Sequence, residues 1–163
     1  HAFITACNTA TERIWLSTPY FVPSPEVASA LQAASLRGVE VKVLVPSKVD
    51  NKLVQLSASC FINDVSKYNV KFFRYSKGFL HQKAFIVDDK IAVIGTANLD
   101  NRSFSLNFEM MVYGFSKSFI SEVEVMLSSD FQGLAQIPID EFENKSFPRR
   151  LLAKICRLLS PLQ

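Results

Sequence analysis

Apolar residues recur along this chain with two different periods, and the period changes every ten to fifteen residues or so. Helical spacing marks Ala2–Thr11 and a second segment that starts after Ser24, an expected N-cap ahead of Pro25, and ends at Gly38. Three further helices are predicted at Asp50–Val65, Lys117–Asp130 and Pro148–Leu159.

Strand-like segments separate these helices. Val39–Pro46 alternates apolar and polar residues and then becomes wholly apolar, which is typical of a strand buried on both faces near its end. Two apolar runs flank Asp89 and Lys90 and predict a hairpin. The predicted strands are Arg13–Thr18, Val39–Pro46, Val70–Tyr75, Lys83–Asp89, Lys90–Gly95 and Glu109–Phe115. The order of elements predicts an α/β fold in which a mixed β-sheet is flanked by helices on both faces.

The composition suits one domain with a core of its own, because 48% of the 163 residues are hydrophobic. We expect this domain at residues 1–132 and a tail at 133–163. No apolar run approaches the roughly 18 residues of a membrane span, and the start at His1 indicates a fragment. Three widely spaced cysteines without a CxxC pair predict reduced thiols in a cytosol-facing domain.

One set of polar residues stands at informative spacing: His81, Lys83, Asp88, Gly95, Thr96, Asn98 and Glu109. Residues i and i+2 of a strand face the same side, so His81 and Lys83 are expected to project together. The imidazole can attack phosphorus, while an ammonium, a hydroxyl and an amide bind the phosphate oxygens. Glu109 is the candidate acceptor for the second imidazole nitrogen. The spacing therefore predicts a site for a phosphate ester.

The HxKxxxxD pattern followed by "GTAN" resembles the signature of the phospholipase D superfamily. Within it, "GFLHQK" and "NLDNRSFSLNFE" are similar to the C-terminal catalytic half of bacterial cardiolipin synthases. The resemblance implies an α/β/α sandwich that forms one of two pseudo-symmetric halves. It implies a catalytic set of His81, Lys83, Asp88, Asn98 and Glu109, with Lys83, Asn98 and Thr96 binding substrate. It implies neither a metal nor another cofactor, and the odd offset of Asp88 from Lys83 suggests support of the fold more than chemistry.

The activity implied by the resemblance is phosphatidyl transfer through a phosphohistidine, which condenses two phosphatidylglycerol molecules into cardiolipin and glycerol. The family's site uses two such motifs and this chain has one, so we expect inactivity without the other HxKxxxxD half or a homodimer mate. The implied location is the bacterial inner membrane, with a peripheral domain facing the cytoplasm and any transmembrane segments outside this chain.

Two alternatives remain open. The first is a phospholipase D-type phosphodiesterase or nuclease that acts as a homodimer, and the second is a module that binds lipid head groups without turnover. A nuclease predicts a broad basic surface, whereas the net charge is only +3 and is nearly balanced outside the tail. We therefore expect no nucleic-acid partner.

The tail carries an amphipathic pattern. Its apolar face comprises Leu151, Leu152, Ile155, Leu158 and Leu159. Its basic residues are Arg149, Arg150, Lys154 and Arg157, mostly on another face. Such a helix suits an anionic membrane surface, and the alternative is that its apolar stripe packs on the domain.

Other residues allow two interpretations. Tyr20, Phe21 and Phe79 could line a lipid entrance or belong to the core. Arg102 and Ser103 could contact substrate or form a structural bridge or cap.

Overall fold

A computed structural model describes residues 1–160, with Ser105 described by its backbone alone. The helices are α1 (Ala2–Thr9), α2 (Pro25–Leu36), α3 (Lys52–Ser66), α4 (Asn101–Ser105), α5 (Lys117–Phe131) and α6 (Phe147–Leu158). The strands are β1 (Arg13–Ser17), β2 (Phe21–Val22), β3 (Glu40–Pro46), β4 (Lys71–Tyr75), β5 (Ala84–Val87), β6 (Ile91–Gly95), β7 (Leu99–Asp100) and β8 (Met111–Gly114). The last residues of the predicted tail, 161–163, lie outside the described residues.

The main sheet has six strands in the order β4-β3-β1-β5-β6-β8. β1, β3 and β4 are parallel, whereas β5 is antiparallel to both of its neighbours and β8 is antiparallel to β6. Ala84 pairs with Ser17 on one side and with Ile94 on the other. The carboxyl ends of β1, β3, β4 and β6 therefore meet the amino ends of β5 and β8, and we call this the site end of the sheet.

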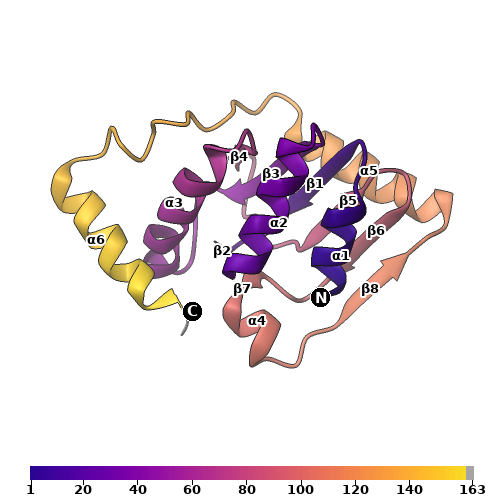
Figure 1. Cartoon of the computed structure of the whole chain (residues 1–163), viewed down its shortest axis with the longest axis horizontal. Coiled ribbons are helices and arrows are strands. Elements are labelled where there is room, and N and C mark those ends of the chain that lie inside the picture. The colour runs from indigo at the N-terminus through magenta and orange to yellow at the C-terminus, as the bar shows by residue number, and fades with distance from the viewer. Residues whose placement is uncertain (161–163) are drawn as a thin grey trace.

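Helices cover both faces of the sheet, as the sequence predicts. α1, α2 and α3 lie on one face and α5 on the other (Figure 1). In β1, Ile14 and Leu16 belong to the core under the first three helices, while Trp15 packs against the core under α5. In β5, Phe85 and Ile86 divide between the two cores in the same way. Alternation along each central strand thus supplies both cores, and the predicted mixed α/β fold is confirmed.

Three short elements escaped the sequence analysis: β2, β7 and α4. β2 and β7 form a two-stranded parallel sheet in which Phe21 pairs with Leu99. A strand of two residues has no periodicity of its own, and Pro19 and Pro23, on either side of β2, are unfavourable for regular strands. Phe21 is fully buried and packs edge-on against Phe72, with ring centroids 4.9 Å apart. Of the two interpretations left open for Phe21, the structure supports the core.

The chain after α5 follows the outer edge of β4. Gln136 forms an antiparallel bridge with Phe73, and the Ile137 N–H donates to the Phe72 carbonyl at 2.7 Å. The connection then runs to α6, which packs beside α3 (Figure 1). Within residues 1–160, no helix is long and apolar enough to cross a membrane.

α6 docks through small side chains and leaves its large ones outside. Ala153 and Cys156 are buried, and Arg157 forms an ion pair with Asp64 of α3. The apolar stripe stays in solvent, with exposed fractions from 47% at Leu151 to 79% at Leu158. The alternative in which this stripe packs on the domain is therefore wrong.

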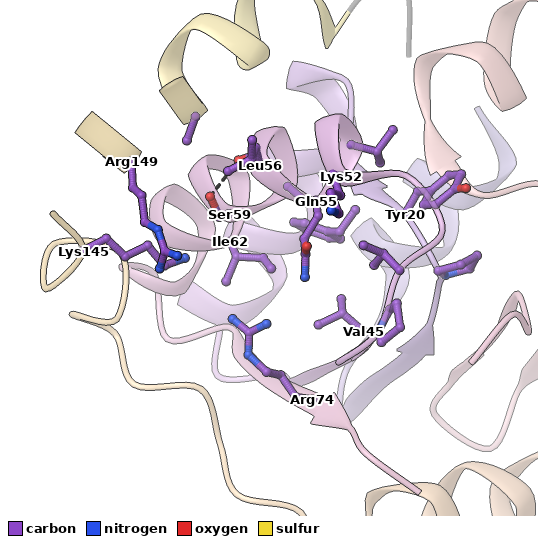
Figure 2. A pocket seen from close by; sticks show the side chains of 17 residues that line it. Tyr20, Val45, Lys52, Gln55, Leu56, Ser59, Ile62, Arg74, Lys145 and Arg149 are labelled. Atoms are coloured by element: carbon purple, nitrogen blue, oxygen red, sulfur yellow. Dashed lines mark hydrogen bonds between the residues drawn. The ribbon is translucent and has the colours of Figure 1, made fainter. Parts of the chain in front are cut away.

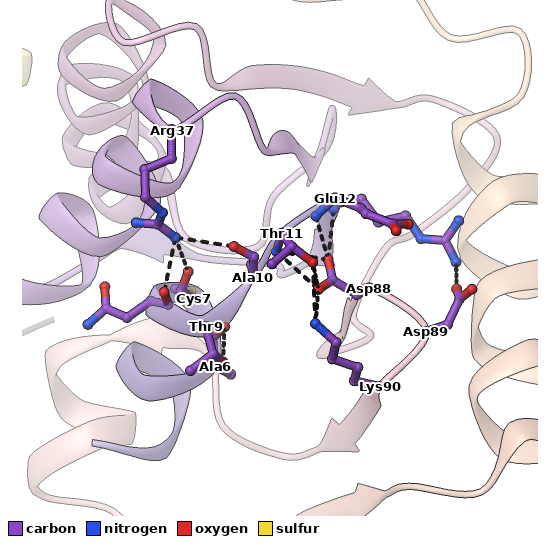
Figure 3. A network of polar contacts seen from close by, with 12 residues as sticks. Ala6, Cys7, Thr9, Ala10, Thr11, Glu12, Arg37, Asp88, Asp89 and Lys90 are labelled. Atoms are coloured by element: carbon purple, nitrogen blue, oxygen red, sulfur yellow. Dashed lines mark hydrogen bonds and ion pairs between the residues drawn. The ribbon is translucent and has the colours of Figure 1, made fainter.

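Asp88 is a buried carboxylate in the turn after β5, at the end of the sheet opposite the site end. Its backbone has a φ of 50°, which aspartate tolerates better than most residues. Its oxygens accept from the N–H groups of Glu12 at 2.9 Å and Arg13 at 3.0 Å, and from the Thr11 hydroxyl at 2.8 Å (Figure 3). Lys90 adds an ion pair at 2.9 Å. Asp88 therefore ties the β5–β6 turn to the start of β1.

We expect Asp88→Asn to lower the free energy of unfolding by about 1–3 kcal/mol at pH 7, because charge-assisted hydrogen bonds are lost. Burial alone would raise the pKa of the Asp88 carboxyl, but the N–H donors of Arg13 and Glu12 outweigh it and hold that pKa well below its ordinary value. The stabilisation is therefore complete above the unfolded pKa of about 3.9 and fades as the pH falls below it. Denaturant unfolding at several pH values measures this loss.

The matched control is Asp89→Asn, one residue along the same turn, because the Asp89 side chain is 79% exposed and pairs with Arg13 at the surface. We expect a change below about 1 kcal/mol there. Equal losses for the two variants, or a loss for Asp88→Asn that persists at low pH, would contradict the assigned role.

Gly95 ends β6 where β8 approaches closely. A Cβ at this position would lie 2.3 Å from the Met110 carbonyl oxygen and 2.4 Å from the Met111 sulfur. We expect Gly95→Ala to lower the free energy of unfolding by about 1–3 kcal/mol through overpacking. Gly78→Ala is the control, because its Cβ would meet nothing closer than Tyr75 at 4.0 Å. Similar denaturant midpoints for the two variants would refute the close-approach explanation.

Candidate active site

His81 and Lys83 lie in the extended segment that enters β5, just before the strand and not on it as predicted. The Gly95 N–H donates to the Lys83 carbonyl at 3.0 Å, which ties this segment to the end of β6. The Lys83 ammonium lies 2.9 Å from the Nδ1 atom of His81 and 2.8 Å from its carbonyl oxygen. The exposed imidazole stacks on the Phe79 ring, with centroids 5.7 Å apart. The structure therefore brings His81 and Lys83 together at the site end of the sheet.

Burial and neighbouring charges have opposite effects on the pKa of Lys83. Partial burial lowers the pKa of the ammonium, while the carboxylates of Glu109, Asp50 and Asp100 act to raise it. The net shift is downward. A partly desolvated cation interacts more strongly with an incoming anion than one in bulk water does.

Thr96 and Glu109 face each other across the ends of β6 and β8. The Thr96 hydroxyl donates to the Glu109 carboxylate, and the Met110 N–H donates to that hydroxyl at 2.9 Å. The Asn107 amide donates to Glu109 at 3.2 Å. These donors, Thr96 first, lower the pKa of Glu109.

The structure does not place Glu109 where the sequence analysis expected it. Among the described residues, its side-chain hydrogen bonds go to Thr96 and Asn107 and none goes to His81. The reason is the strand register: Gly95 pairs with Met111, so the chain before β8 runs beside Thr96. The Nδ1 atom of His81 faces Lys83 instead.

Asn98 lies in the turn between β6 and β7. Its backbone N–H donates to the Ser103 hydroxyl at 3.1 Å, and the Ser103 N–H donates to Asp100 at 2.7 Å as a cap of α4. The structure thus supports the cap interpretation of Ser103, whereas Arg102 is exposed. The Asn98 carbonyl Oδ1 is buried without a partner in the part of the chain that the structure describes. This free atom is an acceptor, whereas binding of a phosphate oxygen would need the N–H donors of the same amide.

Asp50 was not singled out from the sequence. It accepts a hydrogen bond from the Tyr20 hydroxyl at 2.6 Å. This donor is the main cause of the lowered pKa of Asp50, and the charge of His81 contributes. Burial, followed by the Asp50 hydrogen bond, raises the pKa of Tyr20 to about 12. The signal available in the sequence was position, because Asp50 follows the carboxyl end of a buried parallel strand, where ligand sites of α/β sheets form.

Asp88 is the one proposed catalytic residue that the structure sets apart. It lies five positions after Lys83, which is about 16 Å along an extended chain. Its oxygens are occupied by the start of β1. It does not converge with the other predicted site residues.

The site end thus gathers an imidazole, an ammonium, a hydroxyl, an amide and nearby carboxylates on one partly exposed surface. Such a set can bind an anion and exchange protons with it. Within residues 1–160, no three or more His, Cys, Asp or Glu side chains are grouped as metal ligands would be.

Comparison with known proteins gives a consistent assignment. The family model described as "Cardiolipin synthase, PLD-like domain" matches residues 3–131. Cardiolipin synthase A of Pseudomonas entomophila is 42% identical over 160 residues, and that of Pseudomonas syringae pv. syringae is 43% identical. Each alignment covers 98% of this chain and 33% of the relative, so the chain spans about a third of the length of the curated relatives it matches.

Solved structures share the fold at low sequence identity. The phospholipase D family member Nuc from Salmonella typhimurium has a TM-score of 0.73 at 19% identity, covering 83% of this chain and 88% of that one. Phosphatidylserine synthase of Haemophilus influenzae has a TM-score of 0.75 at 14% identity, covering 98% of this chain and 44% of that one. With the family match over residues 3–131, these findings show that the chain belongs to the cardiolipin synthase, PLD-like domain family.

Proposed function

We propose that this chain is one catalytic half of a cardiolipin synthase that transfers a phosphatidyl group through a phosphohistidine. The observation that carries the proposal is the pairing of His81 and Lys83, 2.9 Å apart, at the same end of the sheet as Thr96, Asn98 and Glu109. The similarity to proteins named cardiolipin synthase A supports phosphatidylglycerol as the substrate.

In the proposed reaction, an imidazole nitrogen attacks the phosphorus of phosphatidylglycerol. An N–P bond forms, the P–O bond to glycerol breaks, and the departing oxygen takes a proton from a general acid. The glycerol hydroxyl of a second phosphatidylglycerol then attacks the phosphorus and gives its proton to the same group. The N–P bond breaks and cardiolipin leaves.

We assign His81 one of the two histidine roles, nucleophile or proton carrier, and assign the other role to a second HxKxxxxD half. Lys83, Asn98 and Thr96 bind the phosphate oxygens. Glu109 orients an imidazole through its second nitrogen, which requires it to give up or share its bond with Thr96. No step is assigned to Asp88, whose part is to hold the fold.

The charge around Lys83 supports the need for a second half. The negative charges of three carboxylates, Glu109, Asp50 and Asp100, act on this single ammonium. A phosphodiester would add another negative charge among them. A second motif, from the same polypeptide or a homodimer mate, would supply the missing cation.

We expect His81→Asn to lower cardiolipin formation by at least about 10³-fold, because a nucleophile or its proton partner is lost. The chain is tested together with a second phospholipase D-like half, using phosphatidylglycerol labelled with ³²P at its phosphate. Label trapped on His81 in an acid-labile form identifies this residue as the nucleophile. His1→Asn removes the only other histidine of the chain and serves as the control with full activity.

Normal turnover in His81→Asn would disprove the proposal. A parallel incubation with single- and double-stranded DNA covers the nuclease alternative. Cleavage of DNA without lipid transfer would replace the transferase by that alternative, and lipid binding without turnover in the assembled halves would favour the binding module.

We also propose that α6 contacts an anionic bilayer surface, which would place the chain on the cytoplasmic side of the bacterial inner membrane. Ile155 and Leu158 are 50% and 79% exposed on its outer face. Lys154 lies beside this stripe and is also exposed. In an anionic bilayer, an exposed apolar stripe can enter the acyl-chain region while the neighbouring cations contact the anionic head groups.

We expect the double variant Ile155→Glu/Leu158→Glu to lower partitioning onto phosphatidylglycerol vesicles by at least about tenfold in co-sedimentation, because burial of two side chains is lost. The control is Val125→Glu on α5, where valine is 66% exposed on another helix. Partitioning that is unchanged in the double variant, or equally strong onto phosphatidylcholine vesicles, would refute membrane contact through α6.

A further inference from the structure

A cavity of about 380 Å³ lies between α3, the ends of β3 and β4, and the start of α6. This volume falls within the roughly 300–1,000 Å³ typical of small-molecule sites. Pro19 and Tyr20, which follow the carboxyl end of β1, line it on one side, and the Tyr20 hydroxyl donates to Asp50. The cavity therefore lies toward the site end of the sheet, and neither His81 nor Lys83 lines it.

The walls of this cavity are mostly apolar. Val45, Leu56 and Ile62 are among the side chains that face its interior (Figure 2). A wall of this kind favours hydrocarbon over water, at a free energy that scales with the apolar area covered. The interior thus suits an aliphatic chain.

Four cationic side chains line the same cavity: Lys52 at the start of α3, and three others that gather at one side. In Figure 2, Arg149, Lys145 and Arg74 surround the side opposite Tyr20. Arg74 and Lys145 share a single carboxylate, that of Glu141. The Arg149 guanidinium has no ion pair or hydrogen bond with another described residue, and no acidic side chain is among the described residues that line the cavity. This side carries excess positive charge and suits a phosphate.

We propose that this cavity binds one anionic phospholipid, with its phosphate at Arg149, Lys145 and Arg74 and part of an acyl chain along α3. The head-group glycerol of such a lipid is attached to the phosphate, on the side opposite Tyr20 and the candidate active site, so we propose this lipid as a bound ligand and not as the acceptor. Arg149 belongs to α6, so a helix lying on a bilayer would hold the basic side of the cavity near the lipid head groups.

The test measures equilibrium binding of dihexanoyl phosphatidylglycerol by titration calorimetry, below the concentration at which this lipid forms micelles. We expect Arg149→Glu to weaken binding by about tenfold or more, because a charge-assisted contact becomes repulsive. Lys117→Glu on α5 is the control, because Lys117 is exposed and does not line the cavity.

A second variant, Ser59→Phe, fills the cavity from the middle of α3 and is expected to weaken binding to a similar extent. Ser121→Phe, at an exposed position of α5 on the other face of the sheet, is its control. Thermal unfolding of each variant confirms that the fold is retained. Affinity that survives both Arg149→Glu and Ser59→Phe would overturn the proposal.

Three ligands separate the sources of the phosphate. Dihexanoyl phosphatidylcholine, which has no net charge, is expected to bind at least about tenfold more weakly than phosphatidylglycerol. Glycerol 3-phosphate is expected to bind more weakly as well, because it has no chain for the apolar wall. Equal affinity for phosphatidylcholine would overturn recognition of an anion, and equal affinity for glycerol 3-phosphate would replace the lipid with a soluble phosphate ester.

Two outcomes separate this proposal from the transferase function. If the wild-type chain binds the lipid but forms no cardiolipin even with the second half present, the transferase proposal fails and the cavity proposal stands. If cardiolipin forms but lipid affinity does not depend on Arg149 or Ser59, the cavity proposal fails and the transferase proposal stands.

Discussion

The antiparallel strand β5 lies in the middle of the sheet, and the position of every site residue depends on its register. It pairs with β1 on one side and β6 on the other, and its four residues are all buried. A shift of the β5 register by one residue would turn each of its side chains to the opposite face of the sheet, and therefore into the other core. This strongly constrains the register. Because β5 runs against its neighbours, the segment that carries His81 and Lys83 enters at the carboxyl ends of β1 and β6. Asp88 secures the opposite end of the strand through the backbone of Glu12 and Arg13.

This arrangement explains how one short motif serves both fold and chemistry. The residues before β5 are free to face solvent and a ligand, because the chain there is outside the strand. The residue after β5 is buried and saturated with hydrogen bonds, which excludes it from direct contact with a substrate. The motif therefore runs from the site end of the sheet to the opposite end, where Asp88 holds the turn after β5.

The tail adds a second functional surface beside the first. α6 buries only small side chains against α3, which leaves its large apolar residues outside and Arg149 at the cavity. The same docking closes the cavity that begins near Tyr20.

Much of this protein was determined by local sequence. Periodicity located the long helices and the main strands, because a buried face must repeat with the geometry of its element. The spacing from His81 to Glu109 predicted a phosphate-ester site, and the odd offset of Asp88 indicated its structural part. These conclusions depend on residues that are close in the chain or on a pattern that the chain itself displays.

Tertiary structure decided the rest. β2 and β7 exist only because Phe21 and Leu99 meet across the fold, and no local pattern encodes a pair of two-residue strands. The bond of Glu109 with Thr96, the bond of Asp50 with Tyr20 and the face by which α6 docks all depend on packing between distant segments. A helix with one apolar stripe normally buries it, and only the position of α3 showed that Ala153 and Cys156 are buried instead. Sequence thus specified which groups are available, whereas long-range packing decided which of them meet.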